Sequence, residues 1–386
     1  MSSLDWIIPE LSRLESQSLR RQQRNITPLP GGRCQMRGET FWNFAANDYL
    51  GLAEDSRLAA AASGAMNDHG LGARASPLVT GRTHWHVRLE QSLAALKQTE
   101  AAILFPSGYA ANLGTVPALV GAEDVIYCDR LNHASLIDGC RLSRARFRVY
   151  PHRDLSTLRQ ELEKGNTFRR RLIVTDSLFS MDGDHAPLRQ LVDLAEEFNA
   201  MLLVDEAHAT GIYGPRGGGL LEQQEIHSPN VIAMGTLSKA IGLQGGFVAG
   251  PAELIAWLWN AARTQVFSTA LPIPVCAAAL QAIELIHGEP ERRTQLLEKS
   301  AHVQEELRCQ GWTIPQAVAG PILPIIVGEA GRALVLADEL EKQEILVAAI
   351  RPPTVPPQTA RLRISLNAAH SEEGIERLLQ ALRGLR

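Results

Sequence analysis

The sequence predicts an α/β protein built on a mostly parallel, seven-stranded sheet that lies between helices. Short apolar runs rich in β-branched residues recur from residue 101 onward, and helix-forming segments separate them. A parallel strand pair needs a crossover of a dozen or more residues, and intervals of about 20 to 30 residues between successive runs meet that need. The seven expected strands are residues 101–105, 125–129, 146–150, 172–176, 201–205, 231–234 and 246–250.

The segment between residues 184 and 200 illustrates one crossover helix. Asp184 or His185 can cap it, and Pro187 fits its first position, where a missing N–H costs nothing. Apolar residues then repeat at intervals of three and four, which is the spacing of a helix with one face on a sheet.

The chain on either side of this sheet has a different pattern. Residues 11–24 have helix-forming composition, and Pro272 with Pro274 introduces an alanine-rich helix that closes the large domain. A smaller α+β unit is expected next, with helices at 296–310, at 331–343 and from 371, and strands at 323–327, 345–350 and 361–366. We therefore expect an N-terminal arm at 1–45, a large domain at 46–286 and a small C-terminal domain at 287–386.

Composition and charge exclude several classes of protein. The 386 residues include 38 Lys and Arg against 42 Asp and Glu, and a net charge of −4 gives no field that would attract nucleic acid or an anionic membrane. The five cysteines are an odd number and lack the CxxC spacing of a zinc site, so no metal is expected. Without an apolar run of signal-peptide or membrane-spanning length, the protein is expected to be cytoplasmic.

Polar residues follow the expected strands, at the edge where parallel α/β sheets bind ligands. Asp205 ends one strand and His208 lies three residues later, although such an acid could equally cap the next turn. Lys239 follows another strand and is surrounded by glycines. Most lysines are solvated, but one held away from water has a lowered pKa and can attack an aldehyde.

Two further strand ends add to this set. Ser107, Gly108 and Tyr109 lead from a strand into a helix, whose first N–H groups can bind a phosphate. His133 follows a fourth strand, where a histidine is more often an ordinary polar residue than a surface for a ring. Pyridoxal phosphate needs all four features: a lysine for its aldehyde, an acid for its ring nitrogen, phosphate donors and an aromatic face.

Several phrases of the sequence resemble the α-oxoamine synthases, a family of fold-type-I pyridoxal phosphate enzymes. In chain order they are NDYLGL, LFPSGYAAN, DRLNHAS, SLFSMDGD, VDEAHATGIYG, TLSKAIG and ARLRISLNAAH, and they cover nearly the whole chain after residue 40. The phrase TLSKAIG contains Lys239, and VDEAHATGIYG contains Asp205 and His208. The resemblance implies the fold-type-I transferase fold and the cofactor.

The resemblance also implies a role for each cofactor residue. Lys239 would hold the cofactor, Asp205 would pair with the pyridine nitrogen, and His133 would stack on the ring. The other implied contacts are Ser180 and His208 to the phenolic oxygen, Gly108, Tyr109 and Thr236 to the phosphate, and Ser268 and Thr269 to the phosphate of the neighbouring subunit in a homodimer.

Substrate residues are implied in the same way. Arg363 matches the carboxylate-binding arginine of the family, although an arginine can also be a solvated charge. The positions that match residues near substrate are Arg20, Asn47, His133, Arg351 and Thr354. One departure is Asp176-Ser177, where the family commonly has an acid and a glycine before the FSMDGD phrase.

The phrase IRPPTVP, residues 350–356, most resembles the members that condense L-alanine with a pimeloyl thioester in biotin biosynthesis. The acyl carrier would be coenzyme A or acyl carrier protein. We expect Lys239 to remove the α-proton of the amino acid and His133 to stabilise the oxyanion that forms at the thioester. Two alternatives stay open: a glycine C-acetyltransferase or other α-oxoamine synthase, and a non-catalytic nucleotide-binding α/β protein with a structural Lys239.

Overall fold

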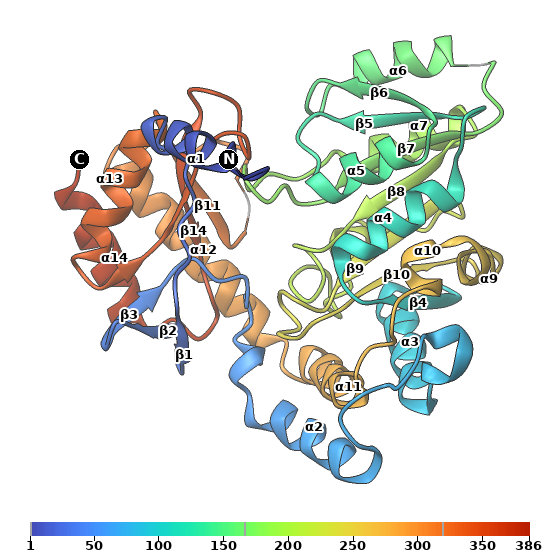
Figure 1. The fold of residues 1–386 in the computed structure, drawn as a ribbon, viewed down its shortest axis with the longest axis horizontal. Helices are drawn as coiled ribbons and strands as arrows, with labels where there is room; N and C mark the ends of the chain where they lie inside the picture. Colours follow the sequence, from blue (N-terminus) through green and yellow to red (C-terminus); the bar gives the residue numbers. More distant parts are fainter. Residues whose placement is uncertain (1, 166, 319) are drawn as a thin grey trace. The chain divides into compact units, whose positions relative to one another are not determined.

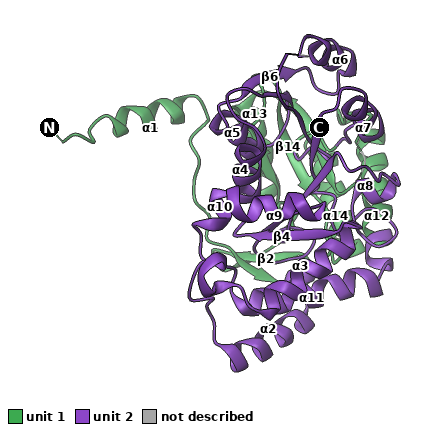
Figure 2. Ribbon diagram, turned by 90° about the vertical axis from the view of Figure 1, so that its right-hand side faces the viewer, with its two compact units in different colours: residues 1–51, 181–183, 295–386 green, residues 52–180, 184–294 purple. Residues whose placement is uncertain are grey.

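The computed structural model describes residues 2–165, 167–318 and 320–386. The chain divides into two compact units, coloured separately in Figure 2. Unit 1 consists of residues 1–51, 181–183 and 295–386, and unit 2 consists of residues 52–180 and 184–294. The N-terminal segment therefore belongs to the same unit as the C-terminal residues.

Unit 2 is built on a seven-stranded sheet with the order β4-β10-β9-β8-β7-β5-β6. Its strands are β4 (Ala101–Phe105), β5 (Val125–Asp129), β6 (Arg146–Tyr150), β7 (Arg171–Asp176), β8 (Met201–Asp205), β9 (Val231–Thr236) and β10 (Gly246–Gly250). β10 is antiparallel to both neighbours, and the other strands run parallel to one another. The predicted fold class and the predicted position of all seven strands are confirmed.

Both faces of this sheet are buried except at the edge strand β6, as expected for parallel strands. On one face, alternate strand residues such as Ile126, Val174 and Leu203 form a core with apolar residues of α4, α5 and α9. On the other face, α3 contacts β4 and β10, and α7 contacts β8. The helices of the unit, labelled where space allows in Figure 1, are α2 (Ser56–His69), α3 (His84–Lys97), α4 (Gly108–Leu119), α5 (Ala134–Leu142), α6 (Leu155–Lys164), α7 (Leu188–Glu197), α8 (Leu220–Gln223), α9 (Ala252–Ala261), α10 (Arg263–Val266) and α11 (Ile273–Gly288), with single turns η1 (Leu52–Glu54) and η2 (Pro77–Gly81).

Unit 1 contains two smaller sheets. The four-stranded sheet has the order β1-β2-β3-β12, and the three-stranded sheet has the order β11-β14-β13. Their strands are β1 (Thr27–Leu29), β2 (Arg33–Met36), β3 (Glu39–Asn43), β11 (Ile322–Gly328), β12 (Ile345–Leu346), β13 (Ala348–Ile350) and β14 (Ala360–Ser365). The helices are α1 (Ile7–Ser16), α13 (Ala330–Glu341) and α14 (Glu372–Gly384), and α12 (Glu291–Cys309) begins in unit 2 and continues into unit 1.

Three local expectations differ from the structure. The N-terminal helix ends at Ser16 and not at residue 24, because Ser18 has a positive φ of 57° that an α-helix cannot contain. Pro187 is the N-cap of α7 and not its first helical residue. The run 345–350 is two strands, since β12 pairs with β3 in one sheet and β13 pairs with β14 in the other.

Candidate active site

The carboxyl ends of the parallel strands lie at one edge of the large sheet, and the polar residues singled out in unit 2 follow those ends. Asp205 is the last residue of β8 and is 3% exposed. Its Oδ2 accepts a hydrogen bond from Asn112 Nδ2 at 2.7 Å, and its Oδ1 accepts one from the Ala207 amide at 2.9 Å. These two donors fix the plane of the carboxylate, which is the condition for pairing with a ring nitrogen.

His133 lies at the end of the β5 loop and caps α5. Its Nδ1 accepts from the Ser135 amide at 3.3 Å and lies 2.7 Å from Ser135 Oγ. Because an N–H donor faces Nδ1, the neutral ring carries its proton on Nε2. Burial lowers the pKa of His133, the nearby Asp205 carboxylate opposes this effect, and the charge of Lys239 lowers the pKa further. The net effect is a lowered pKa of His133, which favours the neutral imidazole.

Asp176 lies beside the predicted site residues Asp205 and His133, and the motif comparison assigned it no role. It ends β7 directly opposite Asp205 in the parallel register, and its Oδ2 accepts from the His133 amide at 2.7 Å. Burial, followed by repulsion from Asp205, raises the pKa of Asp176 well above its usual range. The sequence contains one indication of this location, because Asp176 follows an apolar run in the same way as Asp205 does.

Lys239 lies three residues beyond the end of β9. Its positive charge acts to lower the pKa of both His133 and Asp176, so the amine lies within electrostatic range of these two groups. Thr236, the last residue of β9, is buried, and its Oγ1 donates to the Gly245 carbonyl at 2.8 Å and accepts from the Ser238 amide at 3.2 Å. The segment before Lys239 is therefore a fixed turn.

The start of α4 is packed tightly against this turn. A Cβ on Gly108 would lie 3.2 Å from the Thr236 side chain, and a Cβ on Gly246 would overlap the Ser107 carbonyl and the Gly108 nitrogen. Ser107 Oγ accepts from the Ala110 amide at 3.1 Å. Among the described residues, the amides of Gly108 and Tyr109 have no acceptor within the chain. Two free N–H donors at the start of a twelve-residue helix form a site for an anion.

The other predicted cofactor residues of unit 2 lie in loops. Tyr109 is 44% exposed, and its hydroxyl donates to Asp138, so an anion at α4 would meet its main-chain N–H. The Tyr109 ring stands edge-on to His133, with 6.4 Å between ring centroids. His208 is buried three residues after Asp205, and Ser180 is half-buried after β7.

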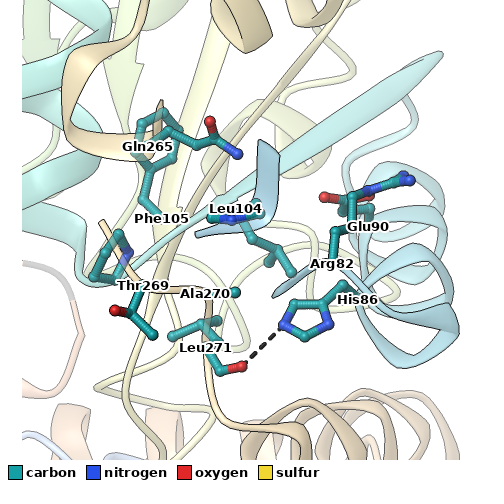
Figure 3. A pocket seen from close by; sticks show the side chains of 11 residues that line it. Arg82, His86, Glu90, Leu104, Phe105, Gln265, Thr269, Ala270 and Leu271 are labelled. Atoms are coloured by element: carbon teal, nitrogen blue, oxygen red, sulfur yellow. Dashed lines mark hydrogen bonds and ion pairs between the residues drawn. The ribbon is translucent and has the colours of Figure 1, made fainter. Parts of the chain in front are cut away.

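Ser268 and Thr269 belong to the segment that joins α10 to α11. The His86 ring holds this segment by donating to the Leu271 carbonyl at 2.9 Å, as the dashed line in Figure 3 shows. His86 Nδ1 accepts from the Thr83 amide at 3.1 Å, which leaves the ring proton on Nε2 for that bond. Thr269 lines the pocket shown in Figure 3, together with Arg82, Glu90 and Gln265.

The predicted substrate residues other than His133 lie in unit 1. Arg363 on β14 is 5% exposed and donates to Asn47 Oδ1 at 3.1 and 3.2 Å from its two terminal nitrogens. It also donates to the Tyr49 hydroxyl at 3.1 Å, and burial raises the pKa of that phenol despite the charge of Arg363. The structure therefore brings Asn47 and Arg363 together and adds Tyr49, which the sequence comparison did not single out.

Arg20, Arg351 and Thr354 form a second group in unit 1. Arg20 and Arg351 line one hollow, whose walls include the apolar side chains Ile26, Leu334, Leu346 and Val347. Arg351 donates to the Ser18 carbonyl, and Arg20 pairs with Glu15 at 2.5 Å. Thr354 Oγ1 accepts from Arg21 at 3.4 Å, so the second arginine of the pair also approaches this region.

The residues of unit 2 fit pyridoxal phosphate. The glycines at 108 and 246 leave room for a close approach to backbone N–H groups, and any Cβ at 246 would collide with the loop that bears them. The donor set supplies an amine in Lys239, an oriented carboxylate in Asp205 and a neutral ring in His133, which are the groups that the cofactor requires.

This fold and this cluster of residues define a fold-type-I, pyridoxal phosphate-dependent transferase. A family model described as aminotransferase class I and II matches residues 39–382. An 8-amino-7-oxononanoate synthase of Anaeromyxobacter dehalogenans is 48% identical over 98% of this chain and 95% of that protein. The 8-amino-7-oxononanoate synthase 2 of Bacillus subtilis is 42% identical over 98% of this chain and 97% of that protein.

Solved structures agree with this assignment. Serine palmitoyltransferase from S. paucimobilis with a bound PLP–myriocin aldimine has a TM-score of 0.93 at 28% identity, over 99% of this chain and 96% of that chain. An 8-amino-7-oxononanoate synthase from Francisella tularensis has a TM-score of 0.78 at 29% identity, over 89% of this chain and 96% of that chain. The chain belongs to the aminotransferase class I and II family and, within it, to the group of relatives named 8-amino-7-oxononanoate synthase. It is a pyridoxal phosphate-dependent acyltransferase, which sets aside the non-catalytic alternative.

Proposed function

We propose that this enzyme condenses L-alanine with a pimeloyl thioester, releasing carbon dioxide and the free thiol carrier, to form 8-amino-7-oxononanoate in biotin biosynthesis. The observation that carries the proposal is the identity of 42% to 48% over 98% of the chain with relatives of that name. The phrase IRPPTVP at residues 350–356 adds support, because it resembles the members that use alanine and a pimeloyl group.

The bound cofactor supplies an aldehyde for the amino group and a ring that accepts the electron pair of the α-carbon. In this proposal Lys239 holds the cofactor in the resting enzyme, and Asp205, oriented by Asn112 and the Ala207 amide, keeps the ring nitrogen protonated. The phosphate is bound by the free amides at the start of α4 and by Thr236. Ser180 and His208 would bind the phenolic oxygen.

The side chains also divide the proton transfers between them. Lys239, once released from the cofactor, is the base that removes the α-proton of the amino acid. His133 is neutral and has its donor on Nε2, so it can donate a hydrogen bond to the oxygen that becomes negative when the thioester carbonyl is attacked. A protonated imidazole would place a second positive charge beside the protonated ring, which the lowered pKa of His133 avoids.

Arg363 is the proposed partner of the amino-acid carboxylate. The guanidinium is already oriented by Asn47 and Tyr49, so little side-chain entropy is lost when a carboxylate binds. Arg20, Arg351 and Thr354 are proposed to contact the acyl substrate. A hollow lined by two arginines and several apolar side chains suits a substrate that has a methylene chain and a carboxylate end.

We also propose a homodimer with shared active sites, in which Ser268 and Thr269 reach the phosphate of the partner subunit. Two segments of unit 2 expose large apolar side chains, with exposed fractions of 58% for Leu78, 73% for Val79 and 71% for Phe267. The Ala270 amide donates to the Ala75 carbonyl at 3.0 Å and joins these segments. A joined set of exposed apolar residues is typical of an interface.

Lys239→Ala tests the cofactor assignment. The purified enzyme should have the visible absorbance of lysine-bound cofactor and should retain cofactor after borohydride reduction and unfolding. Lys239→Ala should lose both properties, whereas Lys164→Ala, which removes an exposed lysine that is paired with Glu161, should keep both. Retention of borohydride-trapped cofactor by the Lys239 variant would overturn the assignment.

The substrates are tested by offering alanine, glycine and serine, each with pimeloyl-CoA, pimeloyl acyl carrier protein and acetyl-CoA. We expect thiol release and carbon dioxide with alanine and a pimeloyl thioester. Turnover with only glycine and acetyl-CoA would make the enzyme a glycine C-acetyltransferase and would contradict the proposal. The acyl carrier follows from which of the two pimeloyl thioesters is consumed at the lower concentration.

A further inference from the structure

Four side chains of unit 2 form one continuous line of hydrogen bonds at the edge of the large sheet. Asn112 Nδ2 lies 2.7 Å from Asp205 Oδ2 and 2.9 Å from Ser135 Oγ, and Ser135 Oγ lies 2.7 Å from His133 Nδ1. These residues come from α4, β8, α5 and the β5 loop. The line therefore connects the carboxylate proposed for the ring nitrogen with the imidazole proposed to stack on the ring.

The direction of each hydrogen bond follows from the chemistry of the groups. An ionised carboxylate only accepts, so the amide nitrogen of Asn112 must face Asp205. The same nitrogen only donates, so Ser135 Oγ must accept from it and give its own proton to His133 Nδ1. The Ser135 amide also donates to Nδ1, at 3.3 Å. A proton on Nδ1 would meet one N–H donor and would force the hydroxyl to turn away.

Three of the four side chains are buried, while the His133 ring at the end of the line is exposed. Asn112 is 0% exposed, Ser135 is 1% exposed and Asp205 is 3% exposed. The charged groups that act on His133 are Asp138 on α5, Asp205 on β8 and Lys239 beyond β9, while Asp176 binds its main-chain amide. The edge of the Tyr109 ring covers another side. Of these groups, only the hydroxyl and amide of Ser135 bond to Nδ1 among the described residues.

We propose that Asn112 and Ser135 are positioning residues, which orient Asp205 and hold His133 neutral with its proton on Nε2 through this one-way line of hydrogen bonds. The proposal deepens the proposed function, on which the cofactor roles of Asp205 and His133 rest. Asn112 has two tasks, because it holds the carboxylate and fixes the direction of the hydroxyl. Ser135 has only the second task.

The test is a pH titration of His133 by NMR in the full-length protein without substrate, with the ring resonances assigned by their loss in His133→Asn. Ser135→Ala and Asn112→Ala should each raise the pKa of His133 by about half a unit to one unit, which is the effect of losing one buried hydrogen bond to the neutral ring. Ser135→Thr keeps the hydroxyl and should restore the wild-type titration. An unchanged pKa in Ser135→Ala, in protein that is folded by circular dichroism, would overturn the proposal.

A second measurement separates the two residues. Fluorescence titration of the apoenzyme with pyridoxal phosphate should give an affinity about tenfold weaker in Asn112→Ala, since Asp205 loses a charge-assisted hydrogen bond. Ser135→Ala should bind the cofactor within about twofold of the wild-type affinity. An equal loss of cofactor affinity in both variants would contradict the proposal that Asn112 alone orients Asp205.

Thr115→Val is the matched control. Thr115 lies one turn beyond Asn112 on α4, is 0% exposed, and its hydroxyl has no hydrogen-bond partner among the described residues. Its loss should change neither the His133 titration nor cofactor affinity; a shift equal to that of Asn112→Ala would assign the effect to packing and overturn the proposal. The titration contains no substrate, so it does not depend on whether the substrates are assigned correctly. If His133 titrates as in the wild type in both Ser135→Ala and Asn112→Ala, the positioning role is wrong but the proposed function is unaffected.

Discussion

Lys97 Nζ lies 2.8 Å from Glu206 Oε2 inside unit 2, and the side chains of the two residues are 1% and 0% exposed. The ammonium also donates to Thr210 Oγ1 at 2.7 Å and to the Gly218 carbonyl at 2.5 Å. Glu206 follows Asp205 directly, so this ion pair connects α3 with the loop that begins at the site carboxylate. All three donor positions of the lysine are used.

Lys97→Met should therefore lower the free energy of unfolding by about 3 kcal/mol, because it leaves the Glu206 carboxylate buried without its cation. Urea unfolding followed by circular dichroism measures the difference. Lys342→Met is the control, since the Lys342–Glu339 pair has a similar distance of 2.6 Å but is 70% and 41% exposed. That control should cost under about 0.5 kcal/mol, and equal losses in the two variants would contradict the prediction.

His152 gives stability a dependence on pH. Its Nδ1 lies 3.0 Å from Asp129 Oδ1 and its Nε2 lies 3.0 Å from Asp184 Oδ2. Burial lowers the pKa of His152, but the two carboxylates outweigh it and raise the pKa from 6.5 to about 9. A raised pKa stabilises the fold fully below pH 6.5, and the contribution is lost as the pH rises through about 9.

The matching variant is His152→Gln, which keeps a side chain capable of hydrogen bonds but cannot carry the charge. Wild type should exceed this variant in unfolding free energy by at most about 3 kcal/mol near pH 6, and the difference should disappear near pH 10. Urea unfolding across this pH range measures it. A difference that stays constant from pH 6 to pH 10 would show that the charge of His152 has no role.

Gly246→Ala should disturb the loop at the start of α4. The new Cβ would overlap the main chain at Ser107 and Gly108, which cannot move aside as a flexible side chain would. We expect a loss of about 1–3 kcal/mol in stability together with weaker binding of pyridoxal phosphate. Gly64→Ala on α2 is the control, because its Cβ meets open space and should stabilise the helix by about 0.5–1 kcal/mol. If Gly246→Ala binds the cofactor with unchanged affinity, the start of α4 is not the phosphate site.

Arg363→Lys tests the carboxylate site. Lysine keeps the charge but loses the fork of donors that Asn47 and Tyr49 orient. The value of kcat/KM for alanine should fall about 10- to 100-fold, mostly through KM, while the cofactor absorbance stays unchanged. Arg377→Lys, at an exposed surface position, should leave both constants unchanged. A fall in kcat with no change in KM would place Arg363 outside the carboxylate site.

Much of the large sheet could be predicted because most of its strands are buried on both faces. Most of them are short apolar runs, and the polar residue that ends a parallel strand marks the ligand-binding edge, as at Asp205. The edge strand β6 is an exception, because it contains two arginines and only Tyr150 is buried. The break within the run 345–350 could not be predicted, because all of its residues are apolar. Its two halves nevertheless belong to different sheets. The N-terminal helix was extended too far because composition does not encode the turn at Ser18.

The hydrogen-bonded support of the site was harder to predict than its strand ends. Asn112 and Asp205 are 93 positions apart in sequence, and an asparagine inside an alanine-rich helix has no pattern that distinguishes it. Asp176 could be noticed from its place at a strand end, yet only the register shows that it lies opposite Asp205 on the neighbouring strand. Such contacts depend on how helices pack across the sheet, which a single sequence does not specify.

The division of the predicted residues between the units has an evolutionary consequence. Those assigned to the cofactor lie in unit 2, whereas those assigned to the substrates lie in unit 1 with the exception of His133: Arg363, Asn47, Arg20, Arg351 and Thr354. The proposed assignments therefore predict that substitutions in unit 1 change substrate choice while the cofactor residues of unit 2 stay the same. Solved structures with this fold include enzymes named for palmitoyl transfer to serine and for 8-amino-7-oxononanoate synthesis. Laboratory evolution of a new acyl specificity should accordingly begin with unit 1.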